Sequence, residues 1–317
     1  MFSLPIAGYH QVYDVADVEK ALNSESERGD TYLRKTLEKM RASTGTRYLI
    51  KPARPDALDG MEELCPNFKS VIEDLKKYLH LAVEGNESLG FMPVLLAGEP
   101  GVGKTHFAKL LAKALGMDFE FLSMGSMTAG WILSGSSPSW HGARYGKVAQ
   151  KLIEGETANP LFALDELDKV GADARYDPMG ALLQLLERET SSHFKDEFLD
   201  IPVDASTILW VATANDLSRI PGPVLQRMAV YDVPNPTPDE AAQIACLVYA
   251  GLLRDHSWKF DPELSQDVKS ALASTAPREM KKHLVDAMGG ALMKGRKHLV
   301  ADDIKPRKGP TRIGFTS

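Results

Sequence analysis

The chain has 317 residues, of which 44% are hydrophobic and 25% are charged, and its formal net charge at pH 7 is −6. This length suffices for a large α/β core with one or two smaller units, and the acidic charge argues against a protein that coats nucleic acid. No stretch is long and apolar enough to span a membrane, and the N-terminal residues lack the basic start and apolar core of a signal peptide. We therefore expect a cytoplasmic protein.

Polar and charged residues dominate the first part of the chain, residues 1–55, which we interpret as an N-terminal extension. Residues 51–55 are typical of a linker, and a further helix is expected at about residues 67–83. Apolar residues at helical spacing predict one amphipathic helix inside the extension, at about residues 30–41: Leu33, Leu37 and Met40.

Apolar runs alternate with helical stretches between residues 56 and 234, which predicts an α/β domain with a parallel sheet covered on both faces. The expected strands are residues 94–97, 119–122, 161–164, 208–212 and 231–233. A proline-rich break at 235–238 then ends the domain. Only helical patterns follow, at residues 239–253, 262–274 and 278–294. We assign residues 235–305 to a small all-helical domain and residues 306–317 to a basic tail.

The segment GEPGVGKT, Gly98 to Thr105, lies between an expected strand and a helical stretch at residues 106–115. Glycines let backbone N–H groups curl around phosphates, Lys104 can reach the β- and γ-phosphates, and the Thr105 hydroxyl can coordinate Mg²⁺. The helix adds its positive N-terminal end. A chance glycine turn is the alternative, but all four motif positions occur in the right frame. The sequence therefore predicts that Mg-ATP is bound by Gly98, Glu99, Pro100, Gly101, Val102, Gly103, Lys104, Thr105 and His106.

Two acids, Asp165 and Glu166, follow the apolar run of residues 161–164, at the carboxyl edge of the expected sheet where ligands bind. Asp165 is placed to hold Mg²⁺, and Glu166 is placed to orient the attacking water, because phosphoryl transfer depends on positioning and charge neutralisation. The alternative is that the two acids only end a strand and cap the next helix. After a phosphate-binding loop, we expect ATP hydrolysis.

These residues together resemble the AAA+ ATPases, and within them the ATPase module of the Lon proteases. GEPGVGKT, NPLFALDELDK, HFKDEFLDIPVD, WVATAND and IPGPVLQRM follow one another in the family's order and at its spacing. The resemblance implies a P-loop α/β fold with a parallel five-stranded sheet sandwiched by helices, followed by an α-helical lid. It also implies that Asn215 is the sensor that hydrogen-bonds the γ-phosphate and water. A neutral amide beside two acids can do this without adding charge, although asparagine is also a common turn-former.

The same resemblance suggests roles for two arginines. Arg227 resembles the arginine finger that one subunit inserts into its neighbour's ATP site, which implies a closed ring, expected to be a hexamer. Arg278, at the start of the last lid helix, resembles the second sensor, which links the γ-phosphate to the position of the lid. Two departures leave alternatives open: Gln226 stands where the family usually has an acid, and Arg219 is another candidate for the finger.

The stretch from Ser123 to Leu152 corresponds to the region that, in Lon-like ATPases, carries a loop lining the central pore and gripping an extended polypeptide. Trp140, His141 and Gly142 fall on that loop. Because the stretch is rich in Ser, Gly and Pro, it is an unusual place to bury an indole, and an exposed aromatic on a loop usually binds something. The alternative is that Trp140 packs back onto the domain. At the positions of Trp140 and His141, the family more often has tyrosine and an aliphatic residue. This difference leaves two alternatives: the loop grips other polypeptides than in the family, or it does not thread polypeptides.

We therefore expect a Mg-ATP-hydrolysing ring ATPase that threads, unfolds or remodels a protein partner. The chain ends soon after the expected lid and contains nothing that resembles the serine–lysine peptidase domain of Lon, so we expect no peptidase activity from it. One alternative is a nucleotide switch that acts on DNA or a nucleoprotein complex, such as a loader or defence factor, which the acidic charge disfavours. Another is a scaffold that assembles with ATP but without turnover, which Glu166, Asn215 and Arg227 disfavour.

Overall fold

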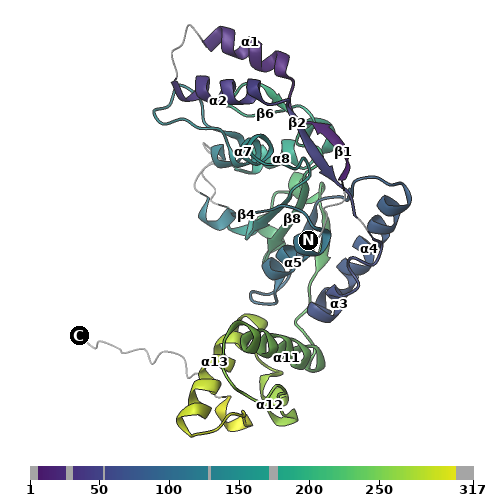
Figure 1. Ribbon diagram of the computed structural model, residues 1–317, viewed down its shortest axis with the longest axis vertical. Helices are drawn as coiled ribbons and strands as arrows, with labels where there is room; N and C mark the ends of the chain where they lie inside the picture. The colour runs from purple at the N-terminus through teal and green to yellow at the C-terminus, as the bar shows by residue number, and fades with distance from the viewer. Residues whose placement is uncertain (1–5, 26–30, 53, 128–129, 171–177, 305–317) are drawn as a thin grey trace, which may run out of the picture. The chain divides into compact units, whose positions relative to one another are not determined.

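The computed structural model of the chain describes residues 6–25, 31–52, 54–127, 130–170 and 178–304 (Figure 1). The chain divides into two compact units. The first contains Met1–Met61, Phe68–Gly98 and Lys104–Val233, and the second contains Glu62–Asn67, Glu99–Gly103 and Pro234–Ser317. The expected basic tail, residues 306–317, lies outside the described residues.

A five-stranded parallel sheet forms the centre of the first unit, which confirms the predicted fold class. Its strands, in spatial order, are β4 (Phe119–Ser123), β5 (Leu161–Asp165), β8 (Leu209–Ala214), β3 (Val94–Ala97) and β9 (Ala229–Asp232). The three inner strands consist almost entirely of buried residues. Burial on both faces explains why their sequences are continuous apolar runs without alternation.

Helices flank this sheet. Phe162 and Trp210 belong to one hydrophobic core with buried residues of α7 (Lys147–Glu154) and α8 (Pro178–Leu185). Helix α5 (Lys104–Leu115) contacts β4, β5 and β8. Its Phe107 ring stacks on Phe68, with ring centroids 4.5 Å apart, at the start of α4 (Lys69–Glu84). In Figure 1, α7 and α8 are drawn on one side of β4 and β8, and α5 on the other.

The N-terminal residues form a small α/β layer that belongs to the same unit. β1 (Ile6–Gln11) pairs antiparallel with β2 (Thr46–Ile50), and α1 (Val15–Glu25) and α2 (Thr31–Ala42) connect them. Helix α2 is the predicted amphipathic helix, and its three predicted apolar residues are buried in the core that α7 and the sheet share. The sequence did not predict β1, α1 or β2. Of the residues interpreted as an extension, those that the structure describes, 6–25 and 31–52, therefore belong to the first unit.

Arg47 on β2 ties this layer to α7. Its side chain is buried, its Nε donates to the Leu152 carbonyl at 2.9 Å, and its Nη2 donates to the Ile153 carbonyl. Both carbonyls lie in the last turn of α7, where the helix dipole also favours a cation. In addition, the Tyr48 N–H donates to the Glu156 carbonyl at 2.9 Å, just after α7. The N-terminal layer is therefore bound to the C-terminal end of α7.

The second unit is built on three helices, α11 (Pro238–Asp255), α12 (Gln266–Leu272) and α13 (Pro277–Met293), which share one apolar core. Thr237 and Glu240 form a capping box at the start of α11. Helix α12 is shorter than predicted because it starts after Ser265, whose hydroxyl caps it by accepting from the Val268 N–H at 3.4 Å. Among the helices that the structure describes, none is long and apolar enough to cross a membrane.

Several shorter elements complete the fold. They are α3 (Met61–Leu64), α6 (Trp131–Ser134), α9 (Arg188–Ser191), α10 (Gly222–Leu225), and the antiparallel strands β6 (Phe194–Lys195) and β7 (Pro202–Val203).

Candidate active site

The loop Gly98–Thr105, which we call the phosphate-binding loop, joins β3 to α5 at the carboxyl edge of the sheet. Gly101 and Gly103 have φ angles of 92° and 105°, a conformation that glycine adopts without strain. A Cβ atom on Gly98 would lie 2.4 Å from the Val233 carbonyl oxygen, so this position also requires glycine. The loop thus fits a phosphate group at the N-terminal end of α5.

Lys104 is buried at the start of α5, and its amine contacts two elements of the sheet edge. Its Nζ donates to the Gly98 carbonyl at 2.6 Å and to Asn215 Oδ1 at 2.9 Å. Burial lowers the pKa of this ammonium group, and the charges of Asp168 and Asp165 oppose that shift. The structure therefore brings together Lys104 and Asn215, which were predicted from distant parts of the sequence.

Thr105 and Asp165 are hydrogen-bonded side by side. The Thr105 hydroxyl donates to Asp165 Oδ1 at 2.6 Å, and the Thr213 hydroxyl donates to the same oxygen at 2.8 Å. Hydroxyl and carboxylate oxygens are ligands that Mg²⁺ prefers, and in nucleotide sites it takes one or two of them together with phosphate oxygens. Thr105 and Asp165 thus fit the predicted metal role, in which Mg²⁺ would neutralise the charge of the phosphates.

Glu166 has the left-handed conformation, with φ 56° and ψ 51°, although it is not a glycine. Such backbone strain is concentrated at functional positions. The Glu166 N–H donates to the Thr213 hydroxyl at 3.0 Å, and its side chain is exposed. The carboxylate of this residue, which directly follows β5, is therefore accessible to water.

Thr213 is the residue of this site that the sequence did not predict. It is buried on β8, and it contacts both acids, as the donor to Asp165 and the acceptor from Glu166. A threonine inside an apolar strand has no distinctive sequence pattern. Its role follows from the register, in which Ala212 pairs with Leu164 and so brings the next residue of β8 beside Asp165.

Comparison with known proteins agrees with this geometry. Residues 94–232 match the family described as the "ATPase family associated with various cellular activities (AAA)". Residues 94–232 therefore form an AAA ATPase domain. The expected similarity to Lon proteases is confirmed, since "Lon protease" of Halothermothrix orenii is 40% identical over 177 residues, covering 55% of this chain and 23% of that protein.

Further relatives of the chain agree. "Lon protease" of Wolbachia pipientis is 42% identical over 154 residues, covering 48% of this chain and 19% of that protein. "Lon protease homolog, mitochondrial" of Caenorhabditis elegans is 42% identical over 160 residues, covering 50% of this chain and 16% of that protein. The chain thus spans roughly a fifth of the length of these curated relatives.

The three arginines considered for the candidate ATP site lie in different surroundings. Arg227 is paired within its own chain, since its Nε and Nη2 both donate to Glu187 Oε2, at 3.1 and 2.9 Å. Arg219 forms an exposed ion pair with Asp216, at 3.2 Å. In the second unit, the Arg278 N–H donates to the Gly101 carbonyl at 3.3 Å, and the Arg278 side chain is exposed. Gly101 and Arg278 belong to the same compact unit.

Trp140, His141 and Gly142 lie in the loop between α6 and α7, and all three are exposed. Trp140 exposes 45% of its surface. At the base of the loop, the Ser136 N–H donates to the Arg144 carbonyl at 3.0 Å, and the Arg144 N–H donates to the Ser136 hydroxyl at 2.9 Å. The aromatic side chain thus stands on a loop that is closed at its base.

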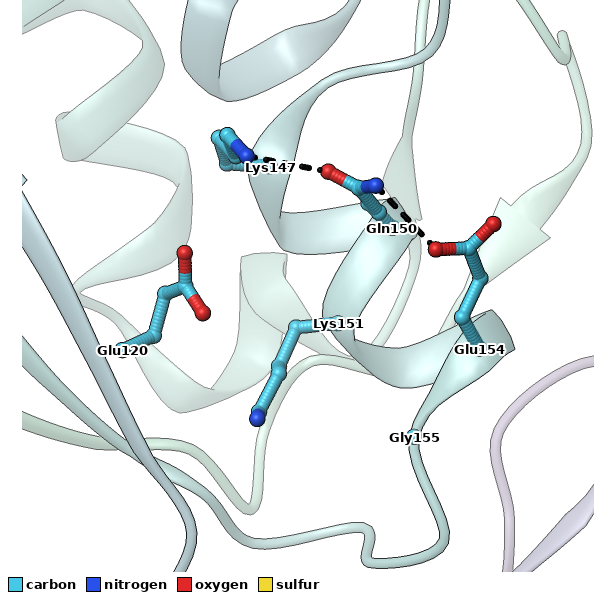
Figure 2. A pocket seen from close by; sticks show the side chains of 6 residues that line it. All are labelled: Glu120, Lys147, Gln150, Lys151, Glu154 and Gly155. Atoms are coloured by element: carbon cyan, nitrogen blue, oxygen red, sulfur yellow. Dashed lines mark hydrogen bonds between the residues drawn. The ribbon is translucent and has the colours of Figure 1, made fainter.

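A surface pocket of about 270 Å³ is lined by residues of α7 and β4 (Figure 2), and none of the residues predicted for ATP is among them. In it, Lys147 Nζ donates to Gln150 Oε1, and Gln150 Nε2 donates to Glu154 Oε2, both at 3.1 Å. The pocket is lined by two lysines and two glutamates, so its net charge favours neither anionic nor cationic ligands. The pocket is lined by Glu120, Lys147, Gln150, Lys151, Glu154 and Gly155.

Proposed function

We propose that this AAA ATPase hydrolyses Mg-ATP as a subunit of a ring, expected to be hexameric, and uses the hydrolysis to thread, unfold or remodel a protein partner in the cytoplasm. The observation that supports it best is the hydrogen-bonded group at the sheet edge, where Lys104 contacts Asn215 and Thr105 contacts Asp165. The same compact unit carries the exposed Trp140.

Each residue of the site has a defined part in this proposal. The backbone from Gly98 to His106 binds the phosphates, with Lys104 on the β- and γ-phosphates. Glu166 orients the attacking water and Asn215 contacts the γ-phosphate, so that both act on the transferred group. Arg278 senses the γ-phosphate from the helical unit, which we assign as the lid.

Trp140 is the residue that we assign to the protein partner. A large flat side chain can pack on an extended chain of almost any sequence, and its burial there contributes apolar area without specific hydrogen bonds. With His141 and Gly142 it forms the exposed part of the loop. The net charge of −6 supports a protein partner over DNA, since phosphate contacts require clustered cations.

The test is to find which macromolecule accelerates ATP hydrolysis. We expect a reduced, carboxymethylated and therefore permanently unfolded protein to stimulate turnover, and duplex DNA to have no effect at low or physiological salt. If DNA stimulates in a strongly salt-dependent manner and the unfolded protein does not, the chain acts on DNA instead. Turnover that no macromolecule changes would also contradict the remodelling proposal.

The part of Trp140 in this function is tested by substitution. Trp140→Ala should remove the stimulation by unfolded protein, whereas Trp140→Tyr should retain much of it, because a large aromatic surface is the physical requirement. Trp258→Ala is a matched control, since Trp258 exposes 38% of its surface but lies in the helical unit. Stimulation of the Trp140→Ala variant equal to that of the unsubstituted protein would exclude the loop from partner binding.

A further inference from the structure

The loop that carries Trp140, residues 135–146, is hydrogen-bonded near both of its ends to two adjacent residues of the segment between β6 and β7. Asp196 lies between β6 and β7 and is completely buried, and its Oδ2 accepts from the Gly146 N–H at 2.7 Å. The neighbouring Glu197 N–H donates to the Ser134 carbonyl at 2.7 Å. The β6–β7 segment therefore holds the loop at its entry and at its exit.

Glycines at the two ends allow this close approach. Gly135 has a φ of 83°, and a Cβ on it would lie 2.3 Å from Asp196 Oδ1. A Cβ on Gly146 would lie 2.2 Å from the Leu133 carbonyl oxygen. Because neither end has room for a side chain, the base of the loop is close-packed around the carboxylate. Such packing leaves little freedom in the direction in which the loop departs.

The two oxygens of Asp196 have separate tasks. Oδ1 accepts from the N–H groups of Phe198 and Leu199, at 2.9 and 3.2 Å, and so shapes its own segment. Oδ2 reaches across to the loop at Gly146. Burial removes the hydration of this carboxylate, and hydrogen bonds from the three N–H groups offset part of that cost. The residue thus connects two segments that are distant in the sequence.

We propose that Asp196 is a positioning residue that fixes the base of the Trp140 loop, so that a protein partner binds a loop whose direction is already set. Binding to a loop that is ordered in advance loses less conformational entropy, and this increases affinity. The inference rests on the proposed function of Trp140. It assigns to Asp196 no contact with the partner or with ATP.

The substitution Asp196→Asn separates the two tasks. If the amide oxygen keeps the two hydrogen bonds from Phe198 and Leu199, the amide nitrogen faces the Gly146 N–H, and two donors then oppose each other. The control is Asp200→Asn, an exposed carboxylate in the same segment whose side chain makes only a surface ion pair with Lys195 at 3.5 Å. Burial raises the pKa of Asp196 to about 7, so assays at pH 8 keep most of the carboxylate ionised.

The measurement is ATP turnover as a function of the concentration of the unfolded, carboxymethylated protein. We expect Asp196→Asn to raise the concentration for half-maximal stimulation by about tenfold, the loss typical of one hydrogen bond to a charged group. Asp200→Asn should change neither this concentration nor basal turnover. A merely structural defect would instead lower basal and stimulated turnover in proportion and leave the half-maximal concentration unchanged, and that result would overturn the proposal.

A milder second variant keeps the test decisive if Asp196→Asn does not fold. Ser136→Ala removes the hydroxyl that accepts from the Arg144 N–H at the same base, and it should raise the half-maximal concentration by a smaller factor. These outcomes are decisive if Trp140→Ala abolishes stimulation. The proposal is then contradicted if the half-maximal concentration is unchanged in both variants. If Asp196→Asn is unfolded, an unchanged half-maximal concentration in Ser136→Ala contradicts it. If Trp140→Ala has no effect, the proposed function itself fails.

Discussion

Thr213 connects the two acids of the ATP site. Its hydroxyl has a single proton, which it donates to Asp165, so its lone pair is left to accept from the Glu166 N–H. Because the side chain is buried on an inner strand, this orientation is fixed. One hydroxyl therefore sets the position of the carboxylate that we propose binds Mg²⁺, and it helps to hold the left-handed backbone of Glu166.

We expect Thr213→Val to lower kcat by about tenfold with little change in KM, because the isosteric side chain removes two hydrogen bonds next to the reacting groups but leaves the phosphate-binding loop intact. Thr213→Ser keeps the hydroxyl and should restore most of the activity. Steady-state kinetics of both variants test this. A rise in KM at constant kcat would show that Thr213 acts on nucleotide binding instead.

Glu166 and Lys104 should fail in different ways when they are substituted. Glu166→Gln removes the group that orients water, so turnover should fall by about a hundredfold or more while Mg-ATP still binds. Lys104→Ala removes the cation that contacts the phosphates and should weaken nucleotide binding. Binding titrations and turnover assays of the two variants separate these effects. Undiminished hydrolysis by Glu166→Gln would remove that residue from the catalytic role.

At the scale of secondary structure, the sequence predicted the elements whose pattern is local. The inner strands are continuous apolar runs, and the phosphate-binding loop is a contiguous motif, so neither depends on distant residues. β1 and β2 were missed because their partners are remote: β2 is fixed by β1 and by the segment around Glu156. Arg47 resembles a surface residue in the sequence, yet it is buried against the end of α7.

The same distinction applies within the site. Asp165, Glu166 and Lys104 could be predicted because each follows or begins an element with a recognisable pattern. Thr213 could not, and neither could Asp196 and Glu187 outside the site, since each acts through a contact with a residue far along the chain. Strand register and the path of a loop decide such contacts, and neither is visible in local composition.

The buried Asp196 should make stability depend on pH. Burial raises its pKa from an ordinary 3.8 to about 7, so between these values the native protein binds a proton that the unfolded chain has released. Its contribution to stability is therefore complete below pH 3.8 and is lost as the pH rises to about 7.

Urea unfolding of the first unit, compared between the unsubstituted protein and Asp196→Asn at pH 5, 6, 7 and 8, tests this. The free energy of unfolding of the unsubstituted protein should fall relative to that of the variant from pH 5 to 7, and the difference should level off by pH 8. Because the other titrating groups are the same in both proteins, their contribution cancels when the two free energies of unfolding are subtracted at each pH. A difference that is constant over this range, or that grows with pH, contradicts the expectation.

At the scale of the whole molecule, Arg227 is held by its own chain. Two of its nitrogens donate to one oxygen of Glu187, and its Nη1 donates to the Pro223 carbonyl at 2.9 Å. An arginine finger has to leave such a partner to reach the phosphate of a neighbouring subunit. The pair is partly exposed, with 32% and 45% of the two side chains accessible, so its ionic attraction is weak enough for a polyanion to displace Glu187.

If Arg227 acts in the neighbouring subunit, two inactive variants should complement each other. In an equimolar mixture of Arg227→Ala and Lys104→Ala, an intact phosphate-binding loop meets an intact finger at about a quarter of the interfaces of a head-to-tail ring, so hydrolysis should recover to about that fraction. Arg219→Ala, alone and in a parallel mixture with Lys104→Ala, decides between the two arginines. If Arg227 is the finger, the Arg219→Ala variant should hydrolyse ATP by itself, whereas the Arg227→Ala variant should not. A chain that stays monomeric with every nucleotide, by sizing and light scattering, would end both the ring and this role.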